Sequence, residues 1–528
     1  MPSAWTLAQV FARRAREQPS RTLLLAGGRP LTYAAVDQRA SALAAAFGDL
    51  GLGVGDRVAI NLPNCAEWVV TMLAVAKLGG VIVPLNPGLS YHELKYQLRH
   101  AEASAVVTVE QYRGDDYLQL FEDLIVELPD LHYLVTVGRE DLWYDDRIFQ
   151  FEDLLSKGEG RAASHPDGVD DASDLAIIYT SGTTGKPKGV RLSHRAVVET
   201  ALRTGEALEV EPSDRVLALV PLFTAFGLGA AVGTVAAGAV LVLQPEMDAG
   251  VALRTIERDE VTVLHAVPTL FHLLMREPAF DPARLRRLRT GVIAGSPAPD
   301  ELLRRVRRWC DVQVAYGLTE TGPTVAITRF GDAEEKRRTT AGRPLPGVEV
   351  RTVDPDTRAP LPAGAAGEIA VRGPNLMSGY ARMPGATARA YTDDGFFLTG
   401  DLGVLDEDGF LRVVGRSRET IVRGGFQIYP REVEDQLRAH PAVDDVCVIG
   451  VPHDVMGELV CACVVPVEGA VITGEDLKHF ADDTMADYKV PDVVRFLDAF
   501  PKTGSGEVER RELERMVALD HTATAPSS

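Results

Sequence analysis

The sequence predicts a large α/β domain followed by a small α+β domain. In the first part of the chain, short apolar runs alternate with helical stretches of about ten to fifteen residues, a pattern typical of βα units with parallel strands buried on both faces. From about Gly342 the pattern changes to short alternating strands with frequent turns, as in GVEVRTVDPDTRAPLPAGAAGEIAVRG. This change indicates a β-rich subdomain within the large domain.

The elements of the large domain follow from local patterns. The first segment, MPSAWTLAQVFARRAREQPS, places charges among its apolar residues, so we expect an amphipathic helix and no signal peptide. The polar stretch 158–174 is expected to be a loop or linker. The most apolar stretch, 226–243, contains four glycines, which favours small-residue packing in a core over a membrane span. Buried strands are expected at 58–62, 80–84, 105–109, 216–220, 239–243 and 261–264.

The domain boundaries are predicted from changes in composition. The N-terminal domain is expected to cover 1–416, with its β-rich subdomain at about 342–416, and the mobile C-terminal domain to cover 417–520. In the latter, Pro430 opens a helix in which acids precede bases, as the helix dipole favours. The tail 521–528 is expected to be disordered.

Charge and cysteine content exclude several classes of protein. The chain has 528 residues, with 55 Lys and Arg against 75 Asp and Glu, which gives a net charge of −20. Such a field disfavours nucleic acid as a partner. The five cysteines form neither a disulfide framework nor a zinc-ligand spacing, so we expect a reducing, cytoplasmic location.

The most informative motif is YTSGTTGKPKGV, residues 179–190. Its Thr, Ser and Gly residues offer unobstructed backbone N–H groups and several hydroxyl donors, a composition that suits phosphate. The motif is not a Walker A loop, because Thr180 stands where the first glycine is required and Pro187 interrupts the helix that should follow.

With its neighbours, this motif resembles the adenylate-forming superfamily, which contains acyl-CoA synthetases such as 4-coumarate-CoA ligases, peptide synthetase adenylation domains and beetle luciferases. The further matching segments are VPLFTAFGL at 220–228, YGLTETGP at 316–323, GEIAVRGPNLMSGY at 367–380, FFLTGD ending at Asp401, and GRSRETIVRGGFQIYPREVE at 415–434. They occur in the family order, and the resemblance spans roughly residues 5–515.

The resemblance implies a two-step reaction in one AMP site. ATP and a carboxylate give an acyl-adenylate, and after the small domain swings, the pantetheine thiol of CoA attacks the activated carbonyl. Tyr316 would stack on adenine, Thr319 would contact the α-phosphate, and Glu320 would bind Mg²⁺ where adenylation occurs. The other AMP- or ATP-binding residues would be Thr180, Ser181, Gly182, Thr183, Thr184, Gly185, Lys188, Gly295, Ser296 and Gly317 around the phosphates and base, with Asp401 and Arg416 on the ribose.

The resemblance also implies acyl and CoA sites. Catalytic positions would be Thr184, Glu320, Arg418 at the hinge, and position 507. Acyl-binding residues would be Phe223, Thr224, Phe226, His265 and Gly317, and CoA would pass Gly424, Gly425 and Phe426. Glycines near a hinge absorb backbone change and allow a thin ligand to pass closely.

The segment FPKTGSGEVERREL, residues 500–513, departs from the family pattern. Relatives carry a lysine directly after the second glycine of the TGSG loop, and this chain carries Glu507. The family lysine bridges the substrate carboxylate and the α-phosphate during adenylation only. We therefore expect weak or absent adenylation with thioester formation retained, on an acyl-adenylate supplied by a separate adenylating ligase.

Two other interpretations remain open. Lys502 or Lys489 could replace the missing lysine and give a complete ATP-dependent acyl-CoA ligase. Alternatively, the protein could bind an adenylate without catalysis. A carrier-protein arm in place of CoA also remains open as the acceptor.

A second departure concerns the acyl pocket. Many relatives carry a histidine at the position of Thr224, and its loss predicts a wider pocket for a bulky hydrophobic carboxylic acid. A separate adenylation step with an enlarged pocket resembles terpenoid-antibiotic pathways such as that of platensimycin, in which the acyl group would be a diterpenoid acid.

Overall fold

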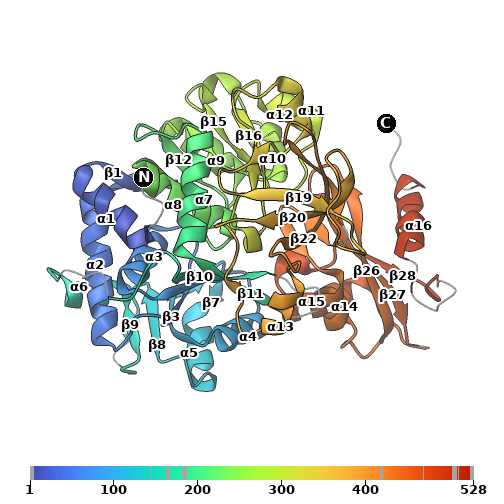
Figure 1. Ribbon diagram of the computed structural model, residues 1–528. Helices are drawn as coiled ribbons and strands as arrows, with labels where there is room; N and C mark the ends of the chain where they lie inside the picture. The colour runs from blue at the N-terminus through green and yellow to red at the C-terminus, as the bar shows by residue number, and fades with distance from the viewer. Residues whose placement is uncertain are drawn as a thin grey trace. The chain divides into compact units, whose positions relative to one another are not determined.

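The computed structural model describes residues 5–142, 144–161, 167–180, 187–416, 420–467, 469–501, 508 and 510–523. Two compact units are distinguished in the chain. The larger comprises Met1–Pro87, Lys95–Tyr179 and Gly189–Ser417, and the smaller comprises Gly88–Leu94, Thr180–Lys188 and Arg418–Ser528. The predicted fold class is confirmed, because the larger unit contains layered, mostly parallel sheets and the smaller unit has a mostly antiparallel sheet with helices (Figure 1).

One large sheet has eight strands within the described residues, and its central strands are parallel. Their apolar, β-branched sequences are buried on both faces, as parallel strands require. In sheet order the strands are β21 (Gly379–Tyr380), β11 (Lys188–Ser193), β10 (Asp174–Thr180), β4 (Val81–Pro84), β3 (Arg57–Asn61), β5 (Ala103–Val109), β8 (Tyr133–Val137) and β9 (Ile148–Gln150).

The second large sheet has nine strands in the described part of the chain. Its order is β18 (Arg343–Pro344), β17 (Ala326–Ile327), β16 (Asp311–Tyr316), β15 (Thr290–Ile293), β14 (Val263–Leu264), β12 (Arg215–Ala218), β13 (Val240–Leu243), β1 (Thr22–Ala26) and β2 (Arg29–Thr32). The segments predicted as buried strands all contribute to these two sheets, with ends that agree or differ by at most two residues.

Helices connect the strands of the larger unit. They are α1 (Leu7–Glu17), α2 (Tyr33–Asp49), α3 (Ala66–Leu78), α4 (Tyr91–Ala101), α5 (Tyr117–Glu127), α6 (Phe151–Gly158), α7 (His194–Ala207), α8 (Ala225–Ala237), α9 (Ala249–Arg258), α10 (Pro268–Arg276), α11 (Asp300–Val306), α12 (Glu334–Thr339) and α13 (Pro384–Arg389). Short 3₁₀ turns lie at η1 (Pro282–Leu285) and η2 (Thr319–Thr321), and β6 (Gln111–Tyr112) pairs with β7 (Asp115–Asp116).

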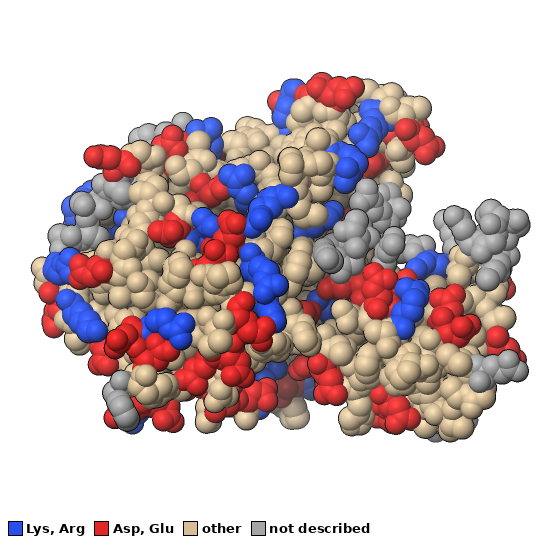
Figure 2. Space-filling model, turned by 90° about the horizontal axis from the view of Figure 1, so that it is seen from below, with Lys and Arg blue, Asp and Glu red and all other residues tan. Residues whose placement is uncertain are grey.

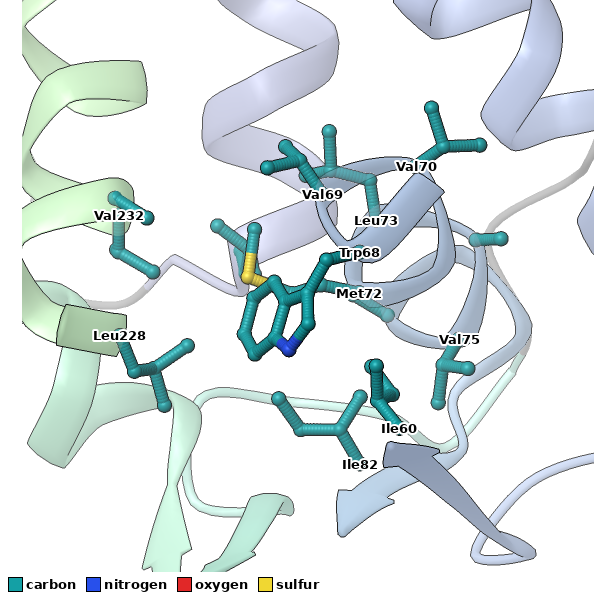
Figure 3. Packing of buried hydrophobic residues seen from close by; sticks show 14 of the residues in the cluster. Ile60, Trp68, Val69, Val70, Met72, Leu73, Val75, Ile82, Leu228 and Val232 are labelled. Carbon is teal, nitrogen blue, oxygen red and sulfur yellow. The ribbon is translucent and has the colours of Figure 1, made fainter. Parts of the chain in front are cut away.

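The glycine-rich apolar stretch forms α8 and then β13, so it lies inside the core. Its helix places Leu228 and Val232 against the buried indole of Trp68 on α3 (Figure 3). Ile60 of β3 and Ile82 of β4 complete this cluster from the sheet. Helix α8 is therefore held on one side by a densely packed core, which limits its movement.

The β-rich subdomain is a four-stranded antiparallel sheet. Its strands are β19 (Glu349–Val353), β20 (Ala366–Arg372), β22 (Phe397–Leu405) and β23 (Leu411–Arg416). Asp401 and Arg416, the two residues predicted at the ribose, are paired across β22 and β23 in this sheet. The side chain of Arg416 lies outside the described residues.

The smaller unit contains β24 (Ile421–Arg423), β25 (Phe426–Ile428), β26 (Val443–His453), β27 (Gly457–Pro466) and β28 (Val493–Phe496), with α14 (Pro430–Leu437), α15 (Gly474–Thr484), η3 (Asp487–Lys489) and α16 (Arg510–Ala523). Helix α14 begins at Pro430, as its first-turn proline predicts. The predicted disordered tail differs from the structure at its start, because α16 continues through Ala523.

Candidate active site

Two predicted nucleotide residues meet in the larger unit. The Tyr316 hydroxyl, at the end of β16, donates a hydrogen bond to Asp401 Oδ2 on β22 at 2.8 Å. Asp401 is 3% exposed, so this bond partly offsets the cost of burying its carboxylate. This bond holds the Tyr316 ring, which is predicted to stack on adenine, beside the Asp401 carboxylate, which is predicted to accept from the ribose hydroxyls.

Glu320 lies in the 3₁₀ turn η2, and Tyr380 of β21 donates a hydrogen bond to Glu320 Oε1 at 3.0 Å. Asn375 fixes the same turn by donating to the Thr321 carbonyl at 2.6 Å. A carboxylate is a ligand type that Mg²⁺ uses, and the metal role of Glu320 stays a prediction. Tyr380 and Asn375 are not among the predicted site residues, although both lie in the family-like segment 367–380.

Two predicted nucleotide-binding glycines in this region lie where a side chain would be strained. A Cβ at Gly317 would lie 2.5 Å from the Pro323 carbonyl oxygen, and Gly295, just after β15, has a φ of +89°. A side chain at either residue would be strained. Ser296 follows, half-buried, and Thr319 opens η2.

The predicted phosphate loop connects β10, which ends at Thr180, to β11, which begins at Lys188. Ser181, Gly182, Thr183, Thr184 and Gly185 lie outside the described residues. The residue before the loop, Tyr179, has its hydroxyl 2.9 Å from His100 Nδ1 and donates to the Gln97 carbonyl. The strand that leads into the loop is thus tied to α4.

The predicted acyl residues separate into two groups. Phe226 and His265 line one cavity, with ring centroids 6.1 Å apart. Thr224 is instead the N-cap of α8, where its hydroxyl accepts from Gly227 N and donates to the Pro221 carbonyl. Phe223 is half-buried. His194, the first residue of α7, accepts from Leu7 N at 3.1 Å, a packing contact.

The buried position of His265 predicts that the stability of the protein depends on pH. Burial lowers its pKa to about 4, and Nδ1 accepts from Val292 N. The unfolded chain, with a histidine pKa near 6.5, binds a proton that the folded protein does not bind, so stability falls as pH falls from about 6.5 toward 4. We expect the unfolding free energy at pH 5, relative to pH 7, to drop by about 2 kcal/mol more in the wild type than in His265→Gln. Urea unfolding of both proteins measures this difference, and equal pH dependence would contradict it.

The smaller unit contains the predicted CoA residues in a tight hairpin. Gly424 and Gly425, with φ of +58° and +89°, connect β24 to β25, as a type I′ turn requires. Phe426 stacks on Tyr488 at 4.5 Å, and Gly424 N donates to the Met456 carbonyl. Arg418 lies outside the described residues.

Glu507 also lies outside the described residues, but the segments on both sides of it are anchored. Phe500 is buried with Leu513 and Val517 of α16. Arg510 Nη2 contacts Glu434 Oε1 of α14 at 2.6 Å. Phe500 and Arg510, the described residues nearest to this position on either side that have such contacts, therefore both pack within the smaller unit.

Within the described ranges, no group of three or more His, Cys, Asp or Glu side chains is placed to bind a metal ion. Among the helices that the structure describes, none has the length and apolar character needed to cross a bilayer. Figure 2 shows acidic side chains interspersed with basic ones over one face, in keeping with the net negative charge.

Comparison with known proteins defines the class that this fold and site represent. The AMP-binding enzyme family matches residues 11–381, and the AMP-binding enzyme C-terminal domain matches residues 432–507. The chain belongs to this family and is an acyl-CoA synthetase-like, adenylate-forming enzyme of the superfamily that its motifs resemble.

Individual relatives cover nearly the whole chain. The putative acyl-CoA synthetase YngI of Bacillus subtilis (strain 168) is 36% identical over 96% of both chains. A feruloyl-CoA synthase of Amycolatopsis sp is 35% identical over 95% of this chain and 97% of its own. The structure of the amide bond synthetase McbA from Marinactinospora thermotolerans superposes with a TM-score of 0.85 at 30% identity, covering 96% of this chain and 99% of that one.

Proposed function

We propose that the protein transfers the acyl group of a preformed acyl-adenylate to CoA. The CoA sulfur forms a bond to the carbonyl carbon, the bond from that carbon to the phosphate oxygen of AMP breaks, and AMP leaves while the thiol proton passes to solvent. The proposal rests on one feature of the sequence: Glu507, the last residue of the C-terminal family match, stands where the resemblance of the TGSG segment implies the adenylation lysine.

The electrostatics of this substitution are unfavourable for adenylation. In that step, residue 507 would face the substrate carboxylate and the α-phosphate, both anionic. At about 4 Å and an effective dielectric of about 20, one charge pair contributes roughly 4 kcal/mol, so reversing its sign costs up to about 8 kcal/mol before relaxation and screening. Since about 1.36 kcal/mol changes a rate tenfold, adenylation would fall by roughly three to six decades.

The rest of the site fits thioester formation. Tyr316 and Asp401 would bind the adenosine of the incoming adenylate, and Glu320 would hold Mg²⁺ only if ATP were used. Thr319 and the phosphate-loop residues would bind the phosphate. The hairpin at Gly424 and Gly425 would admit the pantetheine arm, because glycines leave room for a thin ligand.

The alternative of a complete ligase is weakened by the position of Lys489. Its Nζ lies 2.7 Å from Glu432 Oε1, and the two side chains are 3% and 8% exposed. A buried, paired ammonium is held by its partner and is a poor replacement for a lysine that reaches into the active site. Lys502 lies outside the described residues.

The proposal also covers the source of the adenylate, the thiol acceptor and the kind of carboxylic acid. The adenylate would come from a separate adenylating ligase. CoA would be the acceptor, as the activities for which YngI and the feruloyl-CoA synthase are named favour. The acid is apolar, since Phe226, His265 and small residues line the cavity.

A two-arm assay tests the proposal. One arm contains free acids with ATP, Mg²⁺ and CoA, and the other contains the synthetic acyl-adenylates with CoA. We expect thioester from the adenylates and little from the free acids. Comparable thioester in both arms would establish a complete ligase, and tight adenylate binding without any thioester would establish a non-catalytic binding protein. Either of those results would overturn the proposal.

A further inference from the structure

We propose that the larger unit has a second ligand site, a cavity at the amino ends of strands in its eight-stranded sheet, which binds a small organic oxyanion, a carboxylate or a phosphate ester. The cavity has a volume of about 340 Å³, within the range of small-molecule sites. All of its described lining residues belong to the larger unit. The inference goes beyond the proposed function and does not depend on it.

The cavity lies at the edge of the sheet opposite to the predicted phosphate loop. Strands β3, β4, β5 and β10 are parallel (Figure 1). The lining residues Arg57, Val81, Glu102 and Asp174 stand at or directly before the first residues of these strands. Strand β10 then runs for seven residues, about 20 Å, before the predicted phosphate loop. Since ligand sites of α/β sheets usually lie at the carboxyl ends of the strands, this cavity is separate from the predicted adenylate site.

Three guanidinium groups and two carboxylates line the cavity. Arg57 Nη2 lies 2.9 Å from Glu102 Oε2, and Arg382 pairs with the other oxygen of that carboxylate. Arg191 Nε donates to Asp174 Oδ2 at 2.7 Å. The described lining therefore has one positive charge in excess, in a chain whose net charge is −20. Guanidinium groups bind carboxylate and phosphate oxygens with a matching geometry, so the excess charge favours an oxyanion.

The other described lining residues leave this balance unchanged. Burial and the positive charge of Arg382 lower the pKa of His100, so its ring is neutral near pH 7, and His100 Nδ1 lies 2.9 Å from the Tyr179 hydroxyl. Val54 and Ile177 provide apolar parts of the wall. Cationic and apolar surface together suit an oxyanion on a short hydrocarbon body.

The three arginines differ in how firmly they are held. A guanidinium has five N–H donors. Arg57 is fixed by three contacts, because it donates to the Ala101 and Gly55 carbonyls as well as to Glu102. In the described contacts Arg191 and Arg382 each pair with one carboxylate, and their side chains are 44% and 58% exposed. These two arginines therefore have further N–H donors for a ligand.

The backbone at the cavity adopts an unfavourable conformation at two of these charged residues. Glu102 and Arg382, which form an ion pair, have φ of +52° and +54°. Such angles favour glycine and cost free energy in other residues. Glu102 directly follows α4, at a place where glycine commonly ends a helix, and its carboxylate contacts two arginines. Because backbone strain is concentrated at ligand-binding and active sites, this position favours a binding role for the cavity.

Isothermal titration calorimetry tests the site. The probes are inorganic phosphate, phenyl phosphate, succinate and benzoate, with benzamide as the neutral control, and saturating AMP is present so that the adenylate site does not contribute. We expect an organic oxyanion to bind with a dissociation constant below about 1 mM, more weakly as the salt concentration rises from about 0.05 M to about 0.5 M. The preferred probe distinguishes carboxylate from phosphate. Absence of binding by every oxyanion, or equal binding of benzamide, would overturn the proposal.

A matched pair of arginine variants makes the test specific. Arg147 contacts Asp145 at 2.7 Å and is 46% exposed, which closely matches Arg191 with Asp174, but Arg147 is not among the residues that line the cavity. Arg191→Met should weaken oxyanion binding by at least about tenfold, because it removes a charged hydrogen-bond donor, and Arg147→Met should leave it unchanged. Equal affinities in the two folded variants would refute the site.

Val54 offers a second pair of variants. Its side chain is 57% exposed, so neither Val54→Glu nor Val54→Gln should prevent folding. Val54→Glu adds a negative charge beside the arginines and should weaken binding by about threefold to tenfold, while Val54→Gln, of similar size, should change it by less than about twofold. Equal affinities in these two variants would count against an oxyanion in this cavity. Binding is measured without turnover, so a failure of the proposed thioester activity leaves this result intact.

Discussion

Glu507→Lys should raise the rate of ATP-dependent adenylation by roughly three to six decades. The substitution replaces repulsion of the substrate carboxylate and α-phosphate by attraction. Because position 507 is the one at which the family resemblance implies the adenylation lysine, the new ammonium should act on the same two anions. Acid-dependent release of pyrophosphate with ATP and Mg²⁺, in the absence of CoA, measures the rate.

The control for this substitution is Glu507→Gln, which removes the negative charge without adding a positive one. It should recover about half of the gain on the logarithmic scale, because it removes one of two equal electrostatic contributions. The thiolation rate from synthetic adenylate should change little in either variant. No gain in adenylation by Glu507→Lys, in a folded protein, would refute the electrostatic explanation.

Lys489→Met should destabilise the smaller unit by about 3–5 kcal/mol, because it leaves the buried carboxylate of Glu432 without its cation. Burial already raises the pKa of Glu432, and Lys489 opposes that rise. Urea unfolding of the whole chain, monitored at the transition of the smaller unit, measures the loss of stability. If Lys489 were the replacement for the adenylation lysine, the variant would abolish ATP-dependent activity with stability unchanged.

A matched control lies on the same unit. Arg438 forms an ion pair with Asp435 at 3.1 Å in which both side chains are more than 40% exposed. Such surface pairs contribute about 0–1 kcal/mol, so Arg438→Met should change stability little. Equal losses of stability in Lys489→Met and Arg438→Met would show that burial does not determine how much the Lys489–Glu432 pair contributes.

The fold was largely predictable because its signals are local. Apolar runs such as 58–62 and 105–109 can be buried only as interior strands, and Pro430 marks a helix start within a few residues. The tail was the exception, since α16 extends past residue 520 by packing Leu513 and Val517 onto β26 and β27, which composition does not indicate.

The candidate site was predictable as a set of motifs and not as a set of contacts. The bonds of Tyr316 with Asp401, Tyr380 with Glu320, and Lys489 with Glu432 join residues 57 to 85 positions apart, and no local pattern encodes such pairs. The helix cap made by Thr224 is likewise not apparent from its place in the motif, and its acyl role stays a prediction.

The most direct test of the central claim is the ratio of two single-turnover rates in the wild-type protein with one acid. The first rate is adenylate formation from free acid, ATP and Mg²⁺, and the second is thioester formation from the same adenylate and CoA. We predict that thiolation exceeds adenylation by at least about three decades. Rates within one decade of each other would contradict the account and identify a complete ligase.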